Sequence, residues 1–280
     1  MAELGRPLIV PIVTTSSLPS HQPLPDEFVE ALARASSRLG SFARDVRWYP
    51  NVSSTNDVAG VLAERGAPEG CVVVANAQSA GRGRRGRTWT SPAGAGLYVS
   101  ALLRPAEDVP LLTIAAGVAV AEGVQSATGL AVDLKWPNDL FVGGRKVAGI
   151  LAEGNRSAAG RYVIVGFGIN VMPAAYPPEV AVRATSIEGE LGRAVDRGLL
   201  LAECLCSLAD RYADLQRGHG GLVAEAWRLR GARTFGCRVR GDVGGVVVEG
   251  VAESLDETGA LIVRTAHGPA RVTAGEVTWG

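Results

Sequence analysis

The segment of residues 81–87 places four arginines among three glycines, and Trp89 follows two positions later. Between residues 70 and 106 there is no Asp or Glu, so the neighbouring sequence does not neutralise this charge. Glycine lets a backbone approach a ligand closely, and arginine binds carboxylates and phosphates through paired hydrogen bonds. The segment would therefore suit a small molecule that carries a carboxylate, a phosphate or both.

The residues of this loop, taken alone, also allow other interpretations. It formally matches Gly-x-Gly-x-x-Gly, but as a dinucleotide fingerprint the match is weak, because Pro92 argues against a helix opening there. An arginine-rich loop is also typical of a solvated surface or a nucleic-acid contact. Only the remaining motifs favour an anion site.

A second cluster, Lys-Trp-Pro-Asn-Asp at residues 135–139, combines a cation, an amide and an anion. It could be an ion-paired turn between two strands, or a nucleotide site in which Lys135 meets phosphate and Asp139 holds Mg²⁺. Magnesium prefers one or two carboxylates together with phosphate oxygens. Lys146 follows in an apolar run, where an ammonium group requires a partner or a ligand.

Two further motifs complete the set. Ser54, Thr55 and Asn56 precede the apolar positions of a helix, and such residues often do no more than cap it. Gly-Phe-Gly-Ile-Asn at residues 166–170 ends an apolar run with a polar amide, Asn170.

The elements that must position these motifs can be read from the hydrophobic pattern. Gly143 and Gly144 indicate a hairpin turn between two strands. Consecutive strands with helices grouped before and after them are typical of an α+β domain. We expect strands at 46–49, 71–75, 96–102, 131–134, 140–142, 146–153 and 162–166, and helices at 26–40, from 53, at 111–127, 199–216 and 222–230.

Beyond Gly231 the pattern becomes all-β, with short runs at 235–240, 245–252, 260–264 and 270–272 separated by turn residues. About fifty residues of this kind could make a small barrel. We therefore expect a Pro-rich arm with a short helix at 1–44, a catalytic domain at 45–230 and a small β domain at 231–280.

The composition excludes several classes of protein. Lys+Arg and Asp+Glu both number 28, so a protein that coats nucleic acid through its overall charge is disfavoured. The four cysteines and three histidines lack the spacing of a zinc site, a disulfide framework or a Ser-His-Asp site. With no membrane-length apolar run and no secretory signal pattern, we expect a cytoplasmic protein without membrane contact.

Taken together, Ser-Thr-Asn, Gln-x-x-Gly-Arg-Gly-Arg-Arg-Gly-Arg-x-Trp, Lys-Trp-Pro-Asn-Asp, Arg-Lys-x-Ala-Gly-Ile-Leu and Gly-x-Gly-Ile-Asn resemble the motifs of the biotin protein ligases. The resemblance covers about residues 44–280. It implies a mixed β-sheet catalytic domain flanked by helices, similar to class II synthetases, followed by a small SH3-like β-barrel.

The resemblance also implies a reaction. Biotin and ATP would give biotinyl-5′-AMP and pyrophosphate, and a lysine of a biotin carboxyl carrier protein of acetyl-CoA or acyl-CoA carboxylase would then take the biotin. Mg²⁺ is implied as a cofactor. Family members that repress genes carry an N-terminal helix-turn-helix, and residues 1–44 offer at most one helix, so we expect no DNA binding. The oligomeric state stays open.

Residue roles follow from the same resemblance. Lys146 would be the main catalytic residue, supported by Arg84 and Lys135, and Asp139 would hold the metal ion. Biotin would be bound by Ser54, Thr55, Asn56, Gln78, Gly81, Arg82, Gly83, Arg84, Lys146, Gly149 and Leu151. The nucleotide would be bound by Arg85, Arg87, Trp89, Lys135, Asn138, Asp139 and Asn170.

Two rival functions stay in view. A lipoate–protein ligase has the same two-step chemistry, but it would want a long apolar slot in place of the polar Ser-Thr-Asn and Gln set. A nucleic-acid-binding module could use the four loop arginines, although the loop has no interleaved aromatic residues.

Overall fold

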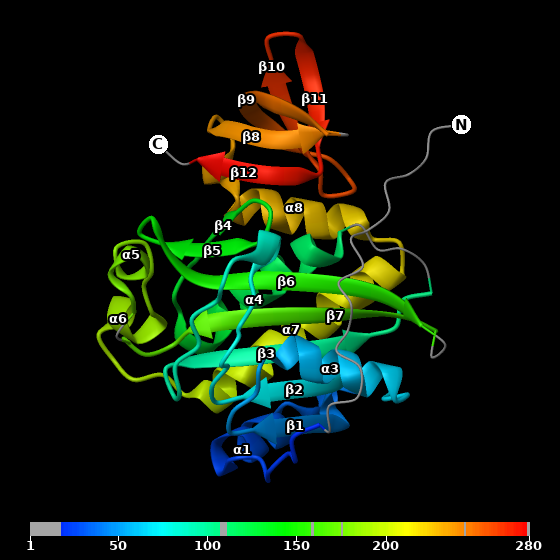
Figure 1. The fold of residues 1–280 in the computed structure, drawn as a ribbon, viewed down its shortest axis with the longest axis vertical. Helices are drawn as coiled ribbons and strands as arrows, with labels where there is room; N and C mark the ends of the chain where they lie inside the picture. Colours follow the sequence, from blue (N-terminus) through cyan, green and yellow to red (C-terminus); the bar gives the residue numbers. More distant parts are fainter. Residues whose placement is uncertain (1–17, 107–110, 158–159, 175, 244, 279–280) are drawn as a thin grey trace.

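The computed structural model describes residues 18–106, 111–157, 160–174, 176–243 and 245–278. Strands in this part of the chain form a seven-stranded sheet in the order β1-β2-β3-β7-β6-β5-β4 and a five-stranded sheet in the order β11-β10-β9-β8-β12 (Figure 1). The strands of the first sheet are β1 Asp45–Tyr49, β2 Cys71–Ala75, β3 Gly96–Leu103, β4 Asp133–Lys135, β5 Asp139–Val142, β6 Arg145–Ser157 and β7 Gly160–Asn170. Those of the second are β8 Arg238–Val243, β9 Val246–Leu255, β10 Leu261–Thr265, β11 Gly268–Val272 and β12 Ala274–Thr278.

Helices cover both faces of the large sheet. Helix α3 lies on one face, while α4 and α7 pack together on the other, with α1 below them and α8 beneath the small sheet (Figure 1). The helices are α1 Asp26–Arg34, α2 Ser36–Leu39, α3 Thr55–Glu64, α4 Leu112–Thr128, α5 Pro178–Ala181, α6 Ile187–Leu191, α7 Arg197–Gln216 and α8 Gly220–Arg230, with 3₁₀ turns at Gly40–Ala43, Arg84–Gly86 and Ala232–Thr234.

The large sheet is mixed, as expected. Strands β1 and β2 run parallel, and each of the other neighbouring pairs is antiparallel. Parallel neighbours need a crossover connection, whereas antiparallel neighbours can be joined by a short turn. Helix α3 provides the crossover between β1 and β2. The α+β class is therefore confirmed.

Strand β2 shows why the sheet holds together. All five of its residues are buried. Val72 and Val74 face the core made by α1, α4 and α7, and Cys71 and Val73 face the core under α3. A strand buried on both faces needs apolar residues at every position, which explains the continuous β-branched run.

The N-terminal helix differs from its prediction over 26–40. It breaks at Ala35, whose φ of −91° and ψ of 0° separate α1 from the short α2. Leu39 and Phe42, beyond the break, are fully buried against the core. The first seventeen residues of the predicted arm lie outside the described residues.

Two α-helices and one strand were missing from the sequence prediction: α5, α6 and β12. Strand β12 has only Val277 as a buried large apolar side chain, so its hydrophobic pattern is too weak to reveal a strand. The two helices are four and five residues long, shorter than a periodic pattern requires.

The small sheet docks on the end of the large one through its β9–β10 turn. The indole Nε1 of Trp136 donates to Gly259 O at 3.0 Å, and Gly259 lies against Leu111 and Ile114 beside α4. Arg228 of α8 donates to Leu255 O at 2.6 Å. No helix in the described part of the chain is both long and apolar enough to cross a bilayer.

Candidate active site

A cavity of about 610 Å³ opens on the α3 face of the large sheet, between the glycine–arginine loop, defined as residues 81–89, and strand β12. Its lining comes from regions far apart in the chain: the start of α3, Gln78, the loop, residues 135–139, strands β6 and β7, Arg183, and residues 275–278 of β12. The large and small sheets therefore both contribute walls.

Glycines form the floor of this cavity. In the register of β6 and β7, Gly149 pairs with Gly168 and Leu151 pairs with Gly166. A Cβ atom on Gly166 would collide with Asn56 Oδ1, and one on Gly168 would collide with the indole of Trp89. The missing side chains are thus the reason why other groups can approach the sheet here.

The polar end of the cavity is built around the first turn of α3. Ser54 occupies the capping position, but its side chain makes no capping hydrogen bond, so the hydroxyl is left for the cavity that it lines. Gln78 Oε1 accepts from Thr55 N at 2.8 Å and from Thr55 Oγ1 at 3.1 Å. Its amide nitrogen donates to Ser91 Oγ at 2.8 Å.

Buried hydrogen bonds fix the same turn from below. The Ser100 hydroxyl lies 2.8 Å from Thr55 Oγ1 and 2.6 Å from Asn56 Oδ1. Thr55, Asn56 and Ser100 are all buried. Because buried polar groups keep their partners, this end offers donors and acceptors in fixed positions.

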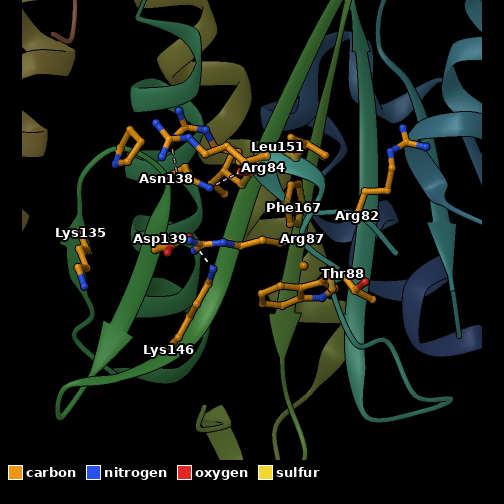
Figure 2. A pocket seen from close by; sticks show the side chains of 18 of the residues that line it. Arg82, Arg84, Arg87, Thr88, Lys135, Asn138, Asp139, Lys146, Leu151 and Phe167 are labelled. Atoms are coloured by element: carbon orange, nitrogen blue, oxygen red, sulfur yellow. Dashed lines mark hydrogen bonds and ion pairs between the residues drawn. The ribbon is translucent and has the colours of Figure 1, made fainter. Parts of the chain in front are cut away.

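The arginines of the loop do not act as one cluster. Arg82 turns toward α3, while Arg84 and Arg87 extend toward β5 (Figure 2). Arg84 Nη1 donates to Asn138 Oδ1 at 3.1 Å, and Arg87 pairs with Glu276 of β12. The loop's polar partners thus come from distant segments, which its own sequence could not indicate.

Burial of the Arg84 guanidinium, together with the charges of Arg85 and Arg87, lowers the pKa of Arg84. Part of the loop's charge is therefore uncompensated. A phosphate or carboxylate in the cavity would relieve that cost.

The lysines stand at the opposite side of the cavity from α3 (Figure 2). Lys146 Nζ lies 2.6 Å from Asp139 Oδ1 and 5.2 Å from the centre of the Trp89 ring. Lys135 Nζ lies 5.1 Å from the ring centre of Phe141, and burial lowers the pKa of Lys135. Both lysines belong to the lining, so an anion bound in the cavity would lie close to two ammonium groups.

The backbone of Lys146 is fixed from outside the strand. Lys146 N donates to Arg183 O at 2.7 Å, and Thr185 N donates to Lys146 O at 2.9 Å. Asn170 Nδ2 in turn donates to Thr185 O at 3.0 Å. Residues 183–185 thus hold the strand that carries the cavity's central lysine.

Most predicted site residues converge on the cavity. Those that line it are Ser54, Thr55, Asn56, Gln78, Arg82, Gly83, Arg84, Arg85, Arg87, Trp89, Lys135, Asn138, Asp139, Lys146, Gly149 and Leu151. Gly81 and Asn170 stand outside the lining: a Cβ on Gly81 would collide with Trp89 O, and Asn170 is buried against Thr185.

Sequence reasoning missed several lining residues, among them Arg183, Phe167 and the β12 segment 275–278. Phe167 lies between the two glycines of a motif already singled out, so that motif could have indicated it. Nothing in the local sequence of Arg183 or β12 sets it apart.

The carboxylate of Asp139 is the cavity's candidate metal ligand. Its Oδ1 is buried, and its partner there is the Lys146 ammonium. Within the described residues, no three His, Cys, Asp or Glu side chains are grouped so as to hold a metal ion. The donor set therefore fits Mg²⁺ brought in by phosphate oxygens, with one carboxylate from the chain.

Comparison with known proteins gives consistent matches. Residues 48–170 match the Biotin/lipoate A/B protein ligase family, and residues 234–278 match the Biotin protein ligase C terminal domain.

A biotin–[acetyl-CoA-carboxylase] ligase of Mycobacterium tuberculosis is 36% identical over 85% of this chain and 90% of its own length. The bifunctional ligase/repressor BirA of Bacillus subtilis is 34% identical over 91% of this chain and 80% of its own. Among solved structures, the biotin protein ligase from Aquifex aeolicus in complex with biotin and ATP matches with a TM-score of 0.70. It is 29% identical, and the match covers 84% of this chain and 98% of that one.

Proposed function

The chain belongs to the biotin protein ligases and is a biotin ligase enzyme, and we propose that it joins biotin to a specific lysine of a biotin carboxyl carrier protein in two ATP-driven steps. The biotin carboxylate attacks the α-phosphorus of ATP, and pyrophosphate leaves. The lysine amine then attacks the carbonyl carbon of biotinyl-5′-AMP, and AMP leaves as the amide forms.

One observation supports this proposal above the others: the cavity has a polar end and a cationic end joined by a glycine floor. Biotin has the matching layout, with a polar ureido group at one end and a carboxylate at the other. We assign the ureido group to Ser54, Thr55, Asn56 and Gln78, and the valeryl chain to Gly149 and Leu151.

The nucleotide would then lie at the cationic end. Lys146 meets the biotin carboxylate and the α-phosphate, and Arg84 and Lys135 stabilise the negative charge that develops on phosphate oxygens. Trp89, Arg85, Arg87 and Asn138 contact the nucleotide, whereas Asn170, which stands outside the lining, would act through Thr185 on the backbone of Lys146. Mg²⁺, held by Asp139 and the phosphates, would neutralise further charge on the leaving pyrophosphate.

Neither step requires a covalent enzyme nucleophile. Catalysis by holding two substrates in attack geometry can supply a large part of the rate. Loop residues Gly81, Arg82 and Gly83 would close over the intermediate and keep water from the mixed anhydride. We further propose that residues 45–230 form the catalytic domain and 231–280 a separate small β domain.

The first test is biotin-dependent exchange of labelled pyrophosphate into ATP. Lys146→Ala should lower the exchange rate by about 10²–10³-fold, the effect of losing one group that stabilises transition-state charge. Arg145→Ala is the matched control, because Arg145 is the neighbouring cation but pairs with Glu190 at 2.6 Å. Its rate should stay within about twofold of wild type.

Other outcomes would contradict the proposal in different ways. Exchange with lipoate in place of biotin would make this a lipoate–protein ligase. Exchange with neither would contradict an adenylation step. Transfer is tested with a biotin carboxyl carrier domain as the acceptor, which should become biotinylated. A variant of that domain with its acceptor lysine changed to arginine should receive no biotin.

A further inference from the structure

The acidic residue Glu153 has no role in the function proposed above, yet it joins two parts of the site. On β6, side chains alternate between faces, so Glu153 lies on the same face as Gly149 and Leu151. It is the next position on that face beyond the cavity floor. It stands outside the cavity lining, so it is placed to act through its neighbours.

A single oxygen of Glu153 makes both connections. Its Oε2 accepts from Asn56 Nδ2 at 2.6 Å and from Arg82 Nη2 at 2.8 Å. Asn56 belongs to the polar end of the cavity, and Arg82 belongs to the glycine–arginine loop. Glu153 thereby connects the loop, through Arg82, to the polar end of the cavity, through Asn56.

The chemistry of a carboxylate gives this contact a direction. An ionised carboxylate can only accept hydrogen bonds, so the nitrogen of the Asn56 amide must face Glu153. Its oxygen then faces Ser100, 2.6 Å away. Ser100 could not set this orientation, because a hydroxyl both donates and accepts, and the other acceptor of the Asn56 nitrogen, Leu151 O, lies farther away at 3.4 Å.

The second partner of Arg82 provides an internal comparison. Arg82 also pairs with Asp57, but the Asn56 side chain donates to Glu153 and Leu151 and not to the Asp57 carboxylate. The hydrogen bonds that Arg82 donates to Asp57 and Glu153 outweigh the effect of burial and raise the pKa of Arg82. The side chains of Arg82, Asp57 and Glu153 are 40%, 44% and 38% exposed. Ion pairs this exposed contribute little to folding stability.

From these contacts we propose that Glu153 is a positioning residue that couples occupancy of the polar end to closure of the loop. It does so by orienting the Asn56 amide and holding Arg82 with one carboxylate oxygen. Biotin binding, more than the chemical step, depends on it. This inference rests on the proposed function, since biotin is the ligand of the polar end.

The test compares Glu153→Gln with Asp57→Asn in the full chain. Glutamine keeps the shape of the side chain, but its amide can also donate, so only the longer contact with Leu151 O still favours the native orientation of the Asn56 amide. Glu153→Gln should raise the Kd for biotin without ATP, and the KM for biotin in pyrophosphate exchange, by about tenfold, the loss of one charge-assisted hydrogen bond. Its kcat and its KM for ATP should stay within about twofold of wild type.

Asp57→Asn removes the other anion beside Arg82 and should change the Kd for biotin by less than about threefold. Both variants should unfold at the wild-type temperature. In a double-mutant cycle, Glu153→Gln and Arg82→Gln should be non-additive in the Kd for biotin, because the two side chains are in contact.

Equal changes in the Kd for biotin in Glu153→Gln and Asp57→Asn would overturn the inference. Any negative charge beside Arg82 would then explain the effect, without the contact to Asn56. A fall in kcat with an unchanged Kd for biotin would also overturn it, and so would additivity in the cycle. If the wild-type chain shows no biotin-dependent exchange, the proposed function itself fails, whereas wild-type exchange with an indifferent Glu153 variant contradicts only this inference.

Discussion

Single atoms decide how a ligand can lie in this cavity, and the clearest case is the Cβ atom that Gly166 lacks. Gly166 sits on the floor between Ser100 of β3 and Leu151 of β6, and the Asn56 amide occupies the space where its side chain would be. The glycine is required here for close approach and not for an unusual backbone conformation.

Gly166→Ala should therefore displace Asn56 and raise the KM for biotin at least about thirtyfold, a loss of roughly 2 kcal/mol. The matched control is Gly154→Ala in β6, where an added Cβ would meet only Val163 Cγ2 at 3.9 Å, an ordinary contact. Similar KM values for biotin in the two variants would contradict this account of the floor.

Lys135 gives the site a pH dependence. Burial lowers its pKa from the ordinary 10.5, so it loses its proton, and with it its attraction for phosphate, at a lower pH than an exposed lysine does. We expect kcat/KM for ATP, which reports the free enzyme, to fall as the pH rises toward 10.5, beginning earlier than for an unperturbed ammonium.

The same shift acts on stability with the opposite sign. The folded chain binds this proton less tightly than the unfolded chain, so the cost of burying the charge disappears as the pH rises through the lowered pKa.

Lys135→Arg, which stays charged, should retain kcat/KM for ATP at alkaline pH relative to its own neutral value. An identical alkaline decline in this variant would assign the titration to another group.

At the scale of elements, the β9–β10 turn is held together by the side chain of Asp256. Asp256 Oδ1 accepts from Thr258 N at 2.8 Å and Ala260 N at 2.9 Å, and Oδ2 accepts from Arg271 Nε at 2.6 Å. Gly259 completes the turn with a φ of +84°, a conformation that glycine adopts readily. This turn presents the carbonyl that Trp136 binds.

Asp256→Ala should lower the free energy of unfolding by about 2–3 kcal/mol, because several donors lose a charged acceptor. Glu257→Ala, an exposed neighbour, should change it by less than about 0.5 kcal/mol. Denaturant unfolding followed on both variants measures the difference.

This contribution also depends on pH. Burial raises the pKa of Asp256, but its hydrogen bonds outweigh burial and leave the pKa below its ordinary 3.8. The stabilisation is therefore present above the unfolded-state pKa and is lost as the pH falls through the folded-state value. Wild type and Asp256→Ala should converge in stability in acid, and a gap that stays constant would contradict the assignment.

How far the sequence predicts an element depends on how much of its burial is encoded locally. Strand β2 was predicted residue for residue, because burial on both faces demands an unbroken apolar run. Strand β12 was missed, since Val277 alone among its large side chains is buried. The break at Ala35 was missed too, because no Gly or Pro marks it.

The site follows the same rule. Residues inside contiguous motifs, such as Lys146 and Gln78, were predicted and lie in the cavity lining. Their partners were not: Glu153 lies 71 residues from Arg82, and Glu276 lies 189 residues from Arg87. Spacing within one segment carries no information about such pairs, which exist only once the sheets have formed.

At the scale of the whole molecule, the two sheets share one site, and Trp136 makes one of the contacts between them. Its indole is 2% exposed and bridges the large sheet to Gly259 of the small one. Removing this donor should loosen the wall that β12 contributes while leaving the large sheet folded.

Trp136→Phe should cost roughly 1 kcal/mol for the hydrogen bond, together with a packing loss of similar size. We expect calorimetry to show the small sheet unfolding earlier than in wild type, and the KM for ATP to rise more than the KM for biotin. One cooperative transition at the wild-type temperature would show that the contact does not couple the sheets.

The contribution of β12 to the cavity has a consequence for how the enzyme comes into being. Residues 275–278 follow all the other lining residues in the chain, and a ribosome makes them after every other part of the wall. The earlier segments can fold on the nascent chain, but they enclose the site on fewer sides until this strand has emerged and paired with β8. If the proposed function holds, competence for adenylation should therefore arise late in translation, after the core that supports it is already in place.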